Sequence, residues 1–188
     1  MRASRVGAVV LSTLLVVCLC AAGAGYIALR SMGWVLARSL DSEPATVAST
    51  GSAIASYELP PGFEAGYAGT MAGFTVVAYN GDDGQSHIYL AQGPQWPTLD
   101  EDALQRQMQT AAGDEEWSEV TVVERYPCQI RGELATVVVS EGRNHDNQPY
   151  RTASAMFSGN GGPALLNIAM PAGRWDQELV NDFVDSLQ

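Results

Sequence analysis

Apolar and polar residues alternate along much of the chain after residue 70, with the two-residue period of half-buried strands. Six runs show this alternation or are rich in β-branched residues: 74–79, 87–92, 120–125, 134–140, 150–157 and 164–170. Turn-forming residues separate them, such as the Asn80 to Gly84 run and the glycines between Gly159 and Gly162. Connections of this length predict an antiparallel sheet of six or seven strands.

Two other segments have the period of a helix. The first begins at Thr98, with Glu101 at capping-box spacing, and its apolar stripe consists of Leu104, Met108 and Ala111 or Ala112. The second begins near Asp176, and its stripe consists of Trp175, Leu179, Val180, Phe183, Val184 and Leu187. Two amphipathic helices covering one face of an antiparallel sheet make an α+β domain.

The segment before the first strand is less regular. Residues 39–56 are rich in Ser, Thr and Ala, so we expect a tether, in which Ser42 and Pro44 are suited to start a weak helix. Pro60 and Pro61 then force an extended path into the domain, which is predicted to cover residues 57–188.

The first 40 residues have a different composition. They contain an uncharged, largely apolar run from Val6 to Leu29, flanked by Arg5 and Arg30, and every acidic residue of the chain lies after position 40. A helix over residues 6–29 would be about 36 Å long, enough to cross a bilayer core of about 30 Å. We therefore expect residues 1–38 to be an N-terminal transmembrane anchor, which contacts the membrane through Val6 to Leu29.

Two alternatives to an uncleaved anchor stay open. A signal peptide would be cleaved near Ala22-Gly23-Ala24, although the apolar run continues beyond this point. A lipoprotein would need a small residue before its modified cysteine, but Val17 precedes Cys18 and Leu19 precedes Cys20. The arginines are nearly balanced across the span, so we expect the usual orientation of an N-terminal anchor, with the following domain outside the cytoplasm.

Charge and composition exclude several classes of function. The part after residue 40 has six arginines and all 21 acidic residues, a net charge of −15. This opposes nucleic-acid binding; a cationic ligand or a basic partner is allowed, but a solvated acidic surface accounts for the same charge. The chain has no lysine, which excludes P-loop phosphate binding, Schiff-base chemistry and kinase-type phosphotransfer. Cys128 is the single cysteine of the domain, so no disulfide can form within it.

The candidate chemical residues form no convincing motif. A metal site would join His145 and Asp146 to Asp82, Asp83 and His87, but neither group has a tight three-ligand spacing, and Asx-rich turns explain both. The turn from Asn80 to Gly84 also departs from a calcium loop.

Other candidate residues have simpler structural explanations. The acids at 100–102 and 114–116 fit solvated positions, Cys128 fits a small buried side chain, and the glycines at 159–162 fit a hairpin turn. Trp96, Trp117 and Trp175 could line a ligand groove, but core or edge packing is the favoured explanation. We predict no catalytic, cofactor-binding or metal residue.

Several short segments of the sequence resemble a known group of proteins. They are the Arg-flanked N-terminal span, the run from Ile54 to Phe63, Ser140-Glu141-Gly142, Tyr150-Arg151, the run from Gly161 to Leu166 and Trp175-Asp176. Together they look like a group of small, uncharacterised, membrane-anchored bacterial proteins. The order of strands and helices over residues 50–188 is also similar to the sandwich of the photosystem II extrinsic subunit PsbP and its relatives. The resemblance implies a fold and no catalytic residue.

The sequence therefore favours a single-pass membrane protein whose extracytoplasmic domain is a non-enzymatic binding or assembly module. A small hydrolase or metal-dependent enzyme that uses His87, His145 and nearby acids is the alternative. A mechanical or stress-related envelope domain without a discrete ligand is a third hypothesis.

Overall fold

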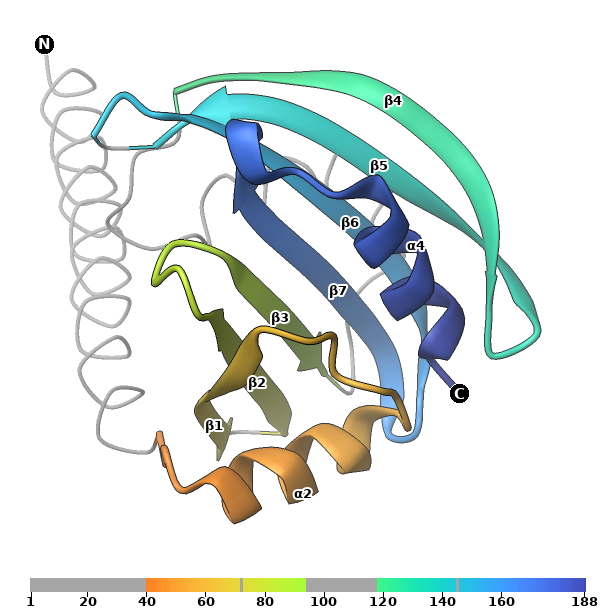
Figure 1. Cartoon of the computed structure of the whole chain (residues 1–188). Helices are drawn as coiled ribbons and strands as arrows, with labels where there is room; N and C mark the ends of the chain where they lie inside the picture. The colour runs from red at the N-terminus through yellow and green to blue at the C-terminus, as the bar shows by residue number, and fades with distance from the viewer. Residues whose placement is uncertain (1–39, 72, 94–117, 145) are drawn as a thin grey trace, which may run out of the picture. The chain divides into compact units, whose positions relative to one another are not determined.

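The computed structural model describes residues 40–71, 73–93, 118–144 and 146–188 (Figure 1). Along the chain the elements are α2 (Pro44–Ile54), β1 (Phe63–Met71), β2 (Phe74–Gly81), β3 (His87–Gln92), β4 (Ser118–Ile130), β5 (Glu133–Arg143), β6 (Pro149–Gly159), β7 (Gly162–Pro171), the 3-10 turn η1 (Ala172–Arg174) and α4 (Gln177–Ser186). Residues 40–188 form one compact unit.

The seven strands form a single sheet in the order β1-β2-β3-β7-β6-β5-β4. Every pair of neighbours is antiparallel, which confirms the predicted α+β class and all six predicted strands. The glycine run makes the predicted tight hairpin, because Gly159 pairs with Gly162 across the β6–β7 turn.

Two strands differ from the sequence prediction, and both lie at the edges of the sheet. Strand β1 was not predicted, because its two internal glycines and small alanines hide the alternation, and a register shift between Ala65 and Tyr67 interrupts it further. Strand β4 continues through Pro127, where the sequence predicted a break. An edge strand tolerates proline, since one side of its backbone needs no sheet partner.

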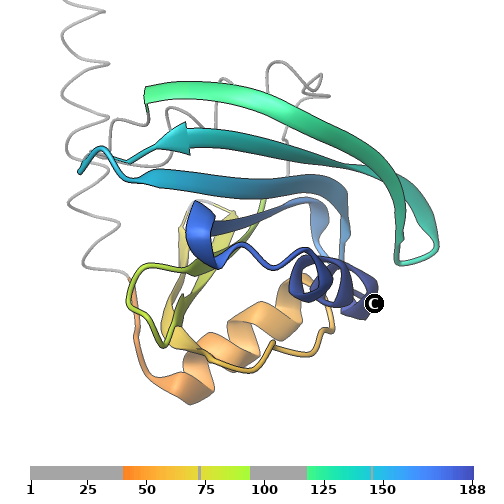
Figure 2. The ribbon, with the colours of Figure 1, turned by 45° about the horizontal axis from the view of Figure 1, so that its top comes forward.

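The core lies between one face of the sheet and the two helices. Alternate positions of the strands are fully buried, for example Val77 on β2, Leu90 on β3 and Val139 on β5. Helices α2 and α4 contribute to this same core cluster. Figure 2 shows both helices on one side of the curved sheet.

Helix α2 corrects the predicted tether. Its Val47, Gly51 and Ile54 are buried at helical spacing, and Asp41 pairs with Ala68 of β1. The compact domain therefore begins near residue 40 and not at residue 57. The helix begins at Pro44 as proposed, but its N-cap is Glu43, without a side-chain cap hydrogen bond, and not Ser42. Core contacts rather than intrinsic propensity or capping stabilise it.

Helix α4 matches its prediction closely. The Asp176 carboxylate accepts hydrogen bonds from the backbone N–H groups of Glu178 and Leu179, at 3.0 and 3.1 Å. Such a cap is worth about 1 kcal/mol. Val180, Phe183, Val184 and Leu187 of the predicted stripe are buried, while Trp175 and Leu179 pack against the core at its margin.

Some predictions lie outside the described residues. These are the anchor over residues 1–38 and the helix beginning at Thr98. None of the helices in the described ranges is long and apolar enough to cross a membrane.

Candidate functional site

The candidate metal residues at the β2–β3 turn, for which the sequence favoured a turn, have structural partners. His87 Nδ1 lies 3.2 Å from Asn80 Oδ1, and the His87 ring packs beside Tyr89, with 5.8 Å between centroids. His145 is outside the described residues, so its proposed pairing with His87 stays untested. Within the described ranges, no group of three or more His, Cys, Asp and Glu residues is placed to hold a metal ion.

Asp83 is the best-engaged acid of this turn. Its carboxylate accepts hydrogen bonds from the backbone of Gln85 and from the backbone and hydroxyl of Ser86, at 2.7–2.8 Å, and Arg174 lies 3.4 Å away. Burial alone would raise the pKa of Asp83, but these hydrogen bonds and the guanidinium more than offset it, so the pKa lies below its usual value. Asp83 therefore acts as a turn anchor that stays ionised.

Cys128 is poorly suited to be a nucleophile. It lies within β4 and is half-buried. Burial, together with the nearby charge of Asp185, raises the pKa of its thiol. A reactive cysteine needs the opposite, a lowered pKa beside a positive charge.

Two side-chain contacts fix the position of Trp175. Its indole N–H donates to Gln177 Oε1 at 3.1 Å, and the Arg151 guanidinium lies over its ring at 5.8 Å. Trp96, Trp117 and the acids at 100–102 and 114–116 are outside the described residues, so their predicted roles stay untested.

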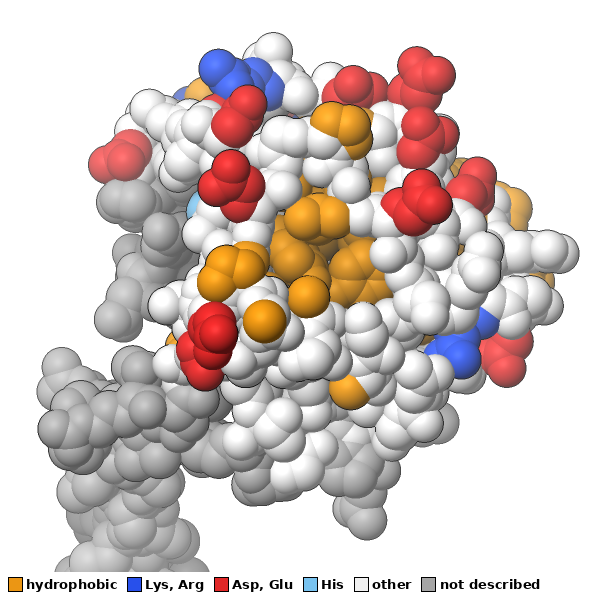
Figure 3. Space-filling view, turned by 60° about the horizontal axis from the view of Figure 1, so that its bottom comes forward, with side chains coloured by type: hydrophobic (Ala, Val, Ile, Leu, Met, Phe, Trp, Pro, Cys, Tyr) orange, Lys and Arg blue, Asp and Glu red, His pale blue; other side chains and the backbone are white. Residues whose placement is uncertain are grey.

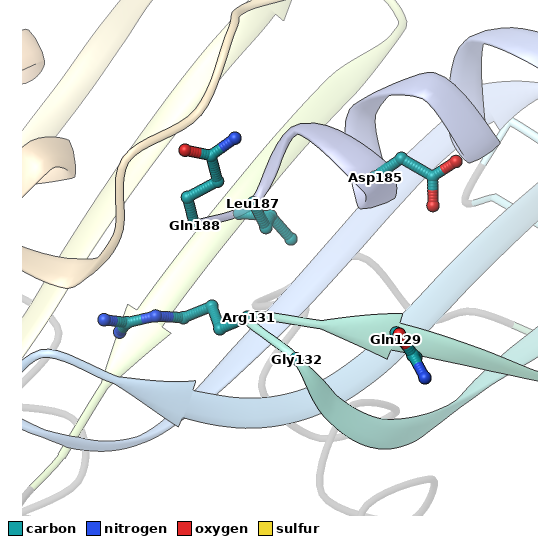
Figure 4. A pocket seen from close by; sticks show the side chains of 6 residues that line it. All are labelled: Gln129, Arg131, Gly132, Asp185, Leu187 and Gln188. Carbon is teal, nitrogen blue, oxygen red and sulfur yellow. The ribbon is translucent and has the colours of Figure 1, made fainter.

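A polar depression of about 510 Å³ lies between the β4–β5 turn and the end of α4. In Figure 4 its side chains point in different directions: Arg131 extends away from Gln129, and Asp185 faces away from both. Arg131 donates to the Ser158 carbonyl at 3.0 Å. Without convergent groups, this depression has no arrangement for acid–base or nucleophilic chemistry.

A second depression, of about 360 Å³, lies at the hairpin ends of β4–β5 and β6–β7. It is lined in part by Leu134, Met156 and Pro163. Leu134 is 81% exposed, the highest value among the exposed large apolar side chains of the described residues. Single exposed apolar residues are common on soluble proteins, so this depression indicates little by itself.

A third feature is a hollow on the side where α2 and α4 lie. Figure 3 shows apolar side chains gathered inside it, with acidic side chains on both sides. Three polar contacts join the segments around it: Arg174 pairs with Asp83, the Asp82 N–H donates to the Gly62 carbonyl, and the Glu58 N–H donates to the Ser186 hydroxyl. Thus η1, the β2–β3 turn, residues 57–63 and α4 are linked in a ring.

This ring carries half-buried apolar side chains that we call the apolar hollow: Leu59, Phe63, Trp175 and Leu179. All four pack against the buried core, which includes Phe183 and Tyr79. An apolar concave surface with few polar groups is typical of a ligand-binding site.

The ring is strongly acidic. Glu58, Asp82, Asp176, Glu178 and Asp182 are exposed on it. Two bases accompany them within the described segments: Arg174 is exposed on η1, and Arg151, which pairs with Glu141, lies over the Trp175 ring. In the sequence, Trp175 and Leu179 belong to the helix stripe and Trp175 is also a candidate groove residue, but no pattern connects them with Leu59 or Phe63. No spacing in the sequence shows that these two distant segments meet.

The comparisons with known proteins add no family. No family model matches the chain, and no curated protein matches it.

Proposed function

We propose that this chain is a single-pass membrane protein whose domain, residues 40–188, lies outside the cytoplasm and works as a non-enzymatic binding or assembly module. The uncharged run from Val6 to Leu29 supports the anchor, and the arginine-flanked N-terminus followed by one domain supports the orientation. We also propose that the sheet with its two helices is a PsbP-like sandwich, supported by the element order alone.

The observation that carries the binding function is the apolar hollow. Four half-buried apolar side chains from two distant segments lie on a ring of linked elements that also carries five exposed acidic residues. By contrast, the best candidates for chemistry among the described residues have structural roles: Asp83 anchors a turn and Cys128 has a raised thiol pKa. The geometry thus favours recognition over turnover.

Site-specific photo-cross-linking in native membranes tests this function. A photo-reactive residue in place of the exposed Asp182, beside the hollow, should give a discrete adduct with a membrane-fraction protein. The same residue in place of Glu124, which is exposed on β4, serves as the matched control and should give none. Equal adducts at both positions, or none at either, would contradict a binding role for this face.

A further inference from the structure

We infer that the apolar hollow binds a basic, apolar-rich peptide segment of a partner protein. Apolar side chains of the segment contact Leu59, Phe63, Trp175 and Leu179, and its Lys or Arg residues lie beside the surrounding carboxylates. This inference rests on the proposed function, because it specifies the partner chemistry of the same module.

The orientation of α4 places a carboxylate next to the hollow. Leu179, Asp182 and Ser186 recur at i, i+3 and i+7, so they lie along one face of the helix. The Ser186 hydroxyl accepts a hydrogen bond at 3.2 Å from the Glu58 N–H. This face of α4 therefore looks toward residues 57–63, and Asp182 lies on the same side as the apolar Leu179.

A second carboxylate lies across the ring. The Asp82 N–H donates to the Gly62 carbonyl at 2.7 Å, and the Asp82 carboxylate lies 3.6–3.8 Å from the position that a Cβ on Gly62 would occupy. Asp82 is thus held next to the segment that carries Leu59 and Phe63. The third acid, Glu58, is exposed on that segment itself.

These three carboxylates are not neutralised within the described part of the chain. Glu58, Asp82 and Asp182 form no ion pair there. The two nearby arginines are already paired, Arg174 with Asp83 at 3.4 Å and Arg151, which lies over Trp175, with Glu141. Carboxylates beside a partly desolvated apolar surface attract a cation more strongly than carboxylates in bulk water. The hollow therefore offers both an apolar contact and a local negative potential.

The same charges disfavour other occupants. A second copy of this domain would bring another acidic surface, at a net charge of −15 after residue 40, against the first. An anionic lipid surface is repelled for the same reason. A peptide with Lys or Arg residues around apolar side chains complements both the apolar surface and the negative potential of the hollow.

Peptide binding to the full chain in nanodiscs of uncharged, zwitterionic lipid tests this inference. The probe is a short amphipathic peptide of Leu, Trp and Lys, and the comparison probe has Glu at every Lys position. We expect saturable binding of the Lys peptide that weakens as salt is raised, and no binding of the Glu peptide. Equal binding of the two peptides, or concentration-dependent self-association that excludes both, would overturn the inference.

Two sets of variants locate the binding. The double change Glu58→Gln/Asp182→Asn should lower the affinity for the Lys peptide by about three- to ten-fold, the effect expected from the loss of two exposed charge pairs. The matched control, Glu43→Gln/Glu124→Gln, removes the same charge from exposed positions on α2's cap and on β4, and should leave the affinity unchanged. Leu179→Lys should abolish binding, with circular dichroism and thermal unfolding confirming that the variant is folded.

An equal effect of both double variants would show that general acidity attracts the peptide, and would overturn the hollow as the site. Failure of this test is distinguishable from failure of the proposed function. If the Asp182 position cross-links to a membrane protein but the Lys peptide does not bind, the partner chemistry is wrong and the binding role stands. If neither occurs, the proposed function fails as well.

Discussion

The hydroxyl groups of Tyr57 and Tyr79 are 2.5 Å apart beneath helix α2, and they occupy the space beside Gly51. A Cβ on Gly51 would overlap the Tyr57 hydroxyl and lie 2.7 Å from that of Tyr79. The Tyr57 ring also packs edge-on against Phe183 of α4, with 5.6 Å between centroids. One tyrosine thus joins the sheet and both helices, and it depends on a glycine within a helix.

We predict that Gly51→Ala destabilises the domain. Alanine would improve helix propensity by about 1 kcal/mol, but the overlap with the tyrosine hydroxyls should cost more, for a net loss of about 1–3 kcal/mol. Chemical denaturation measures this difference. Adding Tyr57→Phe, which removes the overlapped hydroxyl, should recover part of the loss. A more stable Gly51→Ala variant would contradict the observed packing.

The buried tyrosines predict a loss of stability at alkaline pH. Burial, and then the hydrogen bond and charge of Tyr79, raise the pKa of Tyr57, and burial likewise raises the pKa of Tyr79. The folded state holds these protons more tightly than the unfolded state. The contribution of the two tyrosines to the free energy of unfolding is therefore fully present below about pH 10 and falls as the pH rises further. Thermal unfolding between neutral pH and pH 11 measures this, and Tyr57→Phe should reduce the slope. An unchanged slope would show that Tyr57 is not the responsible group.

Asp83→Asn should destabilise the domain by about 1–3 kcal/mol, because an amide cannot replace a carboxylate that accepts three hydrogen bonds and pairs with Arg174. The lowered pKa of Asp83 means that its contribution is present above about pH 4 and is lost as the pH falls through the folded-state value. The neighbouring Asp82→Asn is the control and should change stability little. Similar effects at both positions would contradict the anchoring role of Asp83.

Cys128 should react slowly with thiol reagents. Its raised pKa leaves less thiolate at pH 8 than a free cysteine has, and its half-buried position limits access further. A colorimetric disulfide reagent on a Cys18→Ser/Cys20→Ser background measures the rate for Cys128 alone. A reaction rate above that of the glutathione thiol would contradict this prediction and would indicate that Cys128 is a nucleophile.

The elements that the sequence could predict are those whose pattern is local. Strand alternation, hairpin glycines and the Asp176 cap with its apolar stripe are all local features, and these predictions are confirmed. The stability of helix α2 was underestimated because Gly51 lowers the helix propensity. In the fold, this glycine leaves space for the hydroxyl groups of Tyr57 and Tyr79. Strand β1 was missed because glycines and alanines conceal its period.

The candidate site was beyond the reach of sequence reasoning for a different reason. Leu59 and Leu179 are 120 positions apart in the sequence, and each reads as an ordinary core residue. Their segments meet only in the folded chain, where the Glu58 N–H donates a hydrogen bond to the Ser186 hydroxyl. The candidate metal residues show the converse, since Asp83 and His87 are near in sequence but engaged in separate hydrogen bonds.

Protease accessibility of the full chain in intact cells tests the central claim most directly. We predict that an external protease digests the acidic domain in unbroken cells, while a small fragment containing Val6 to Leu29 stays in the membrane pellet. A full-length chain that is protected until the cells are lysed, and is then recovered in the aqueous fraction without detergent, would contradict both the anchor and the orientation.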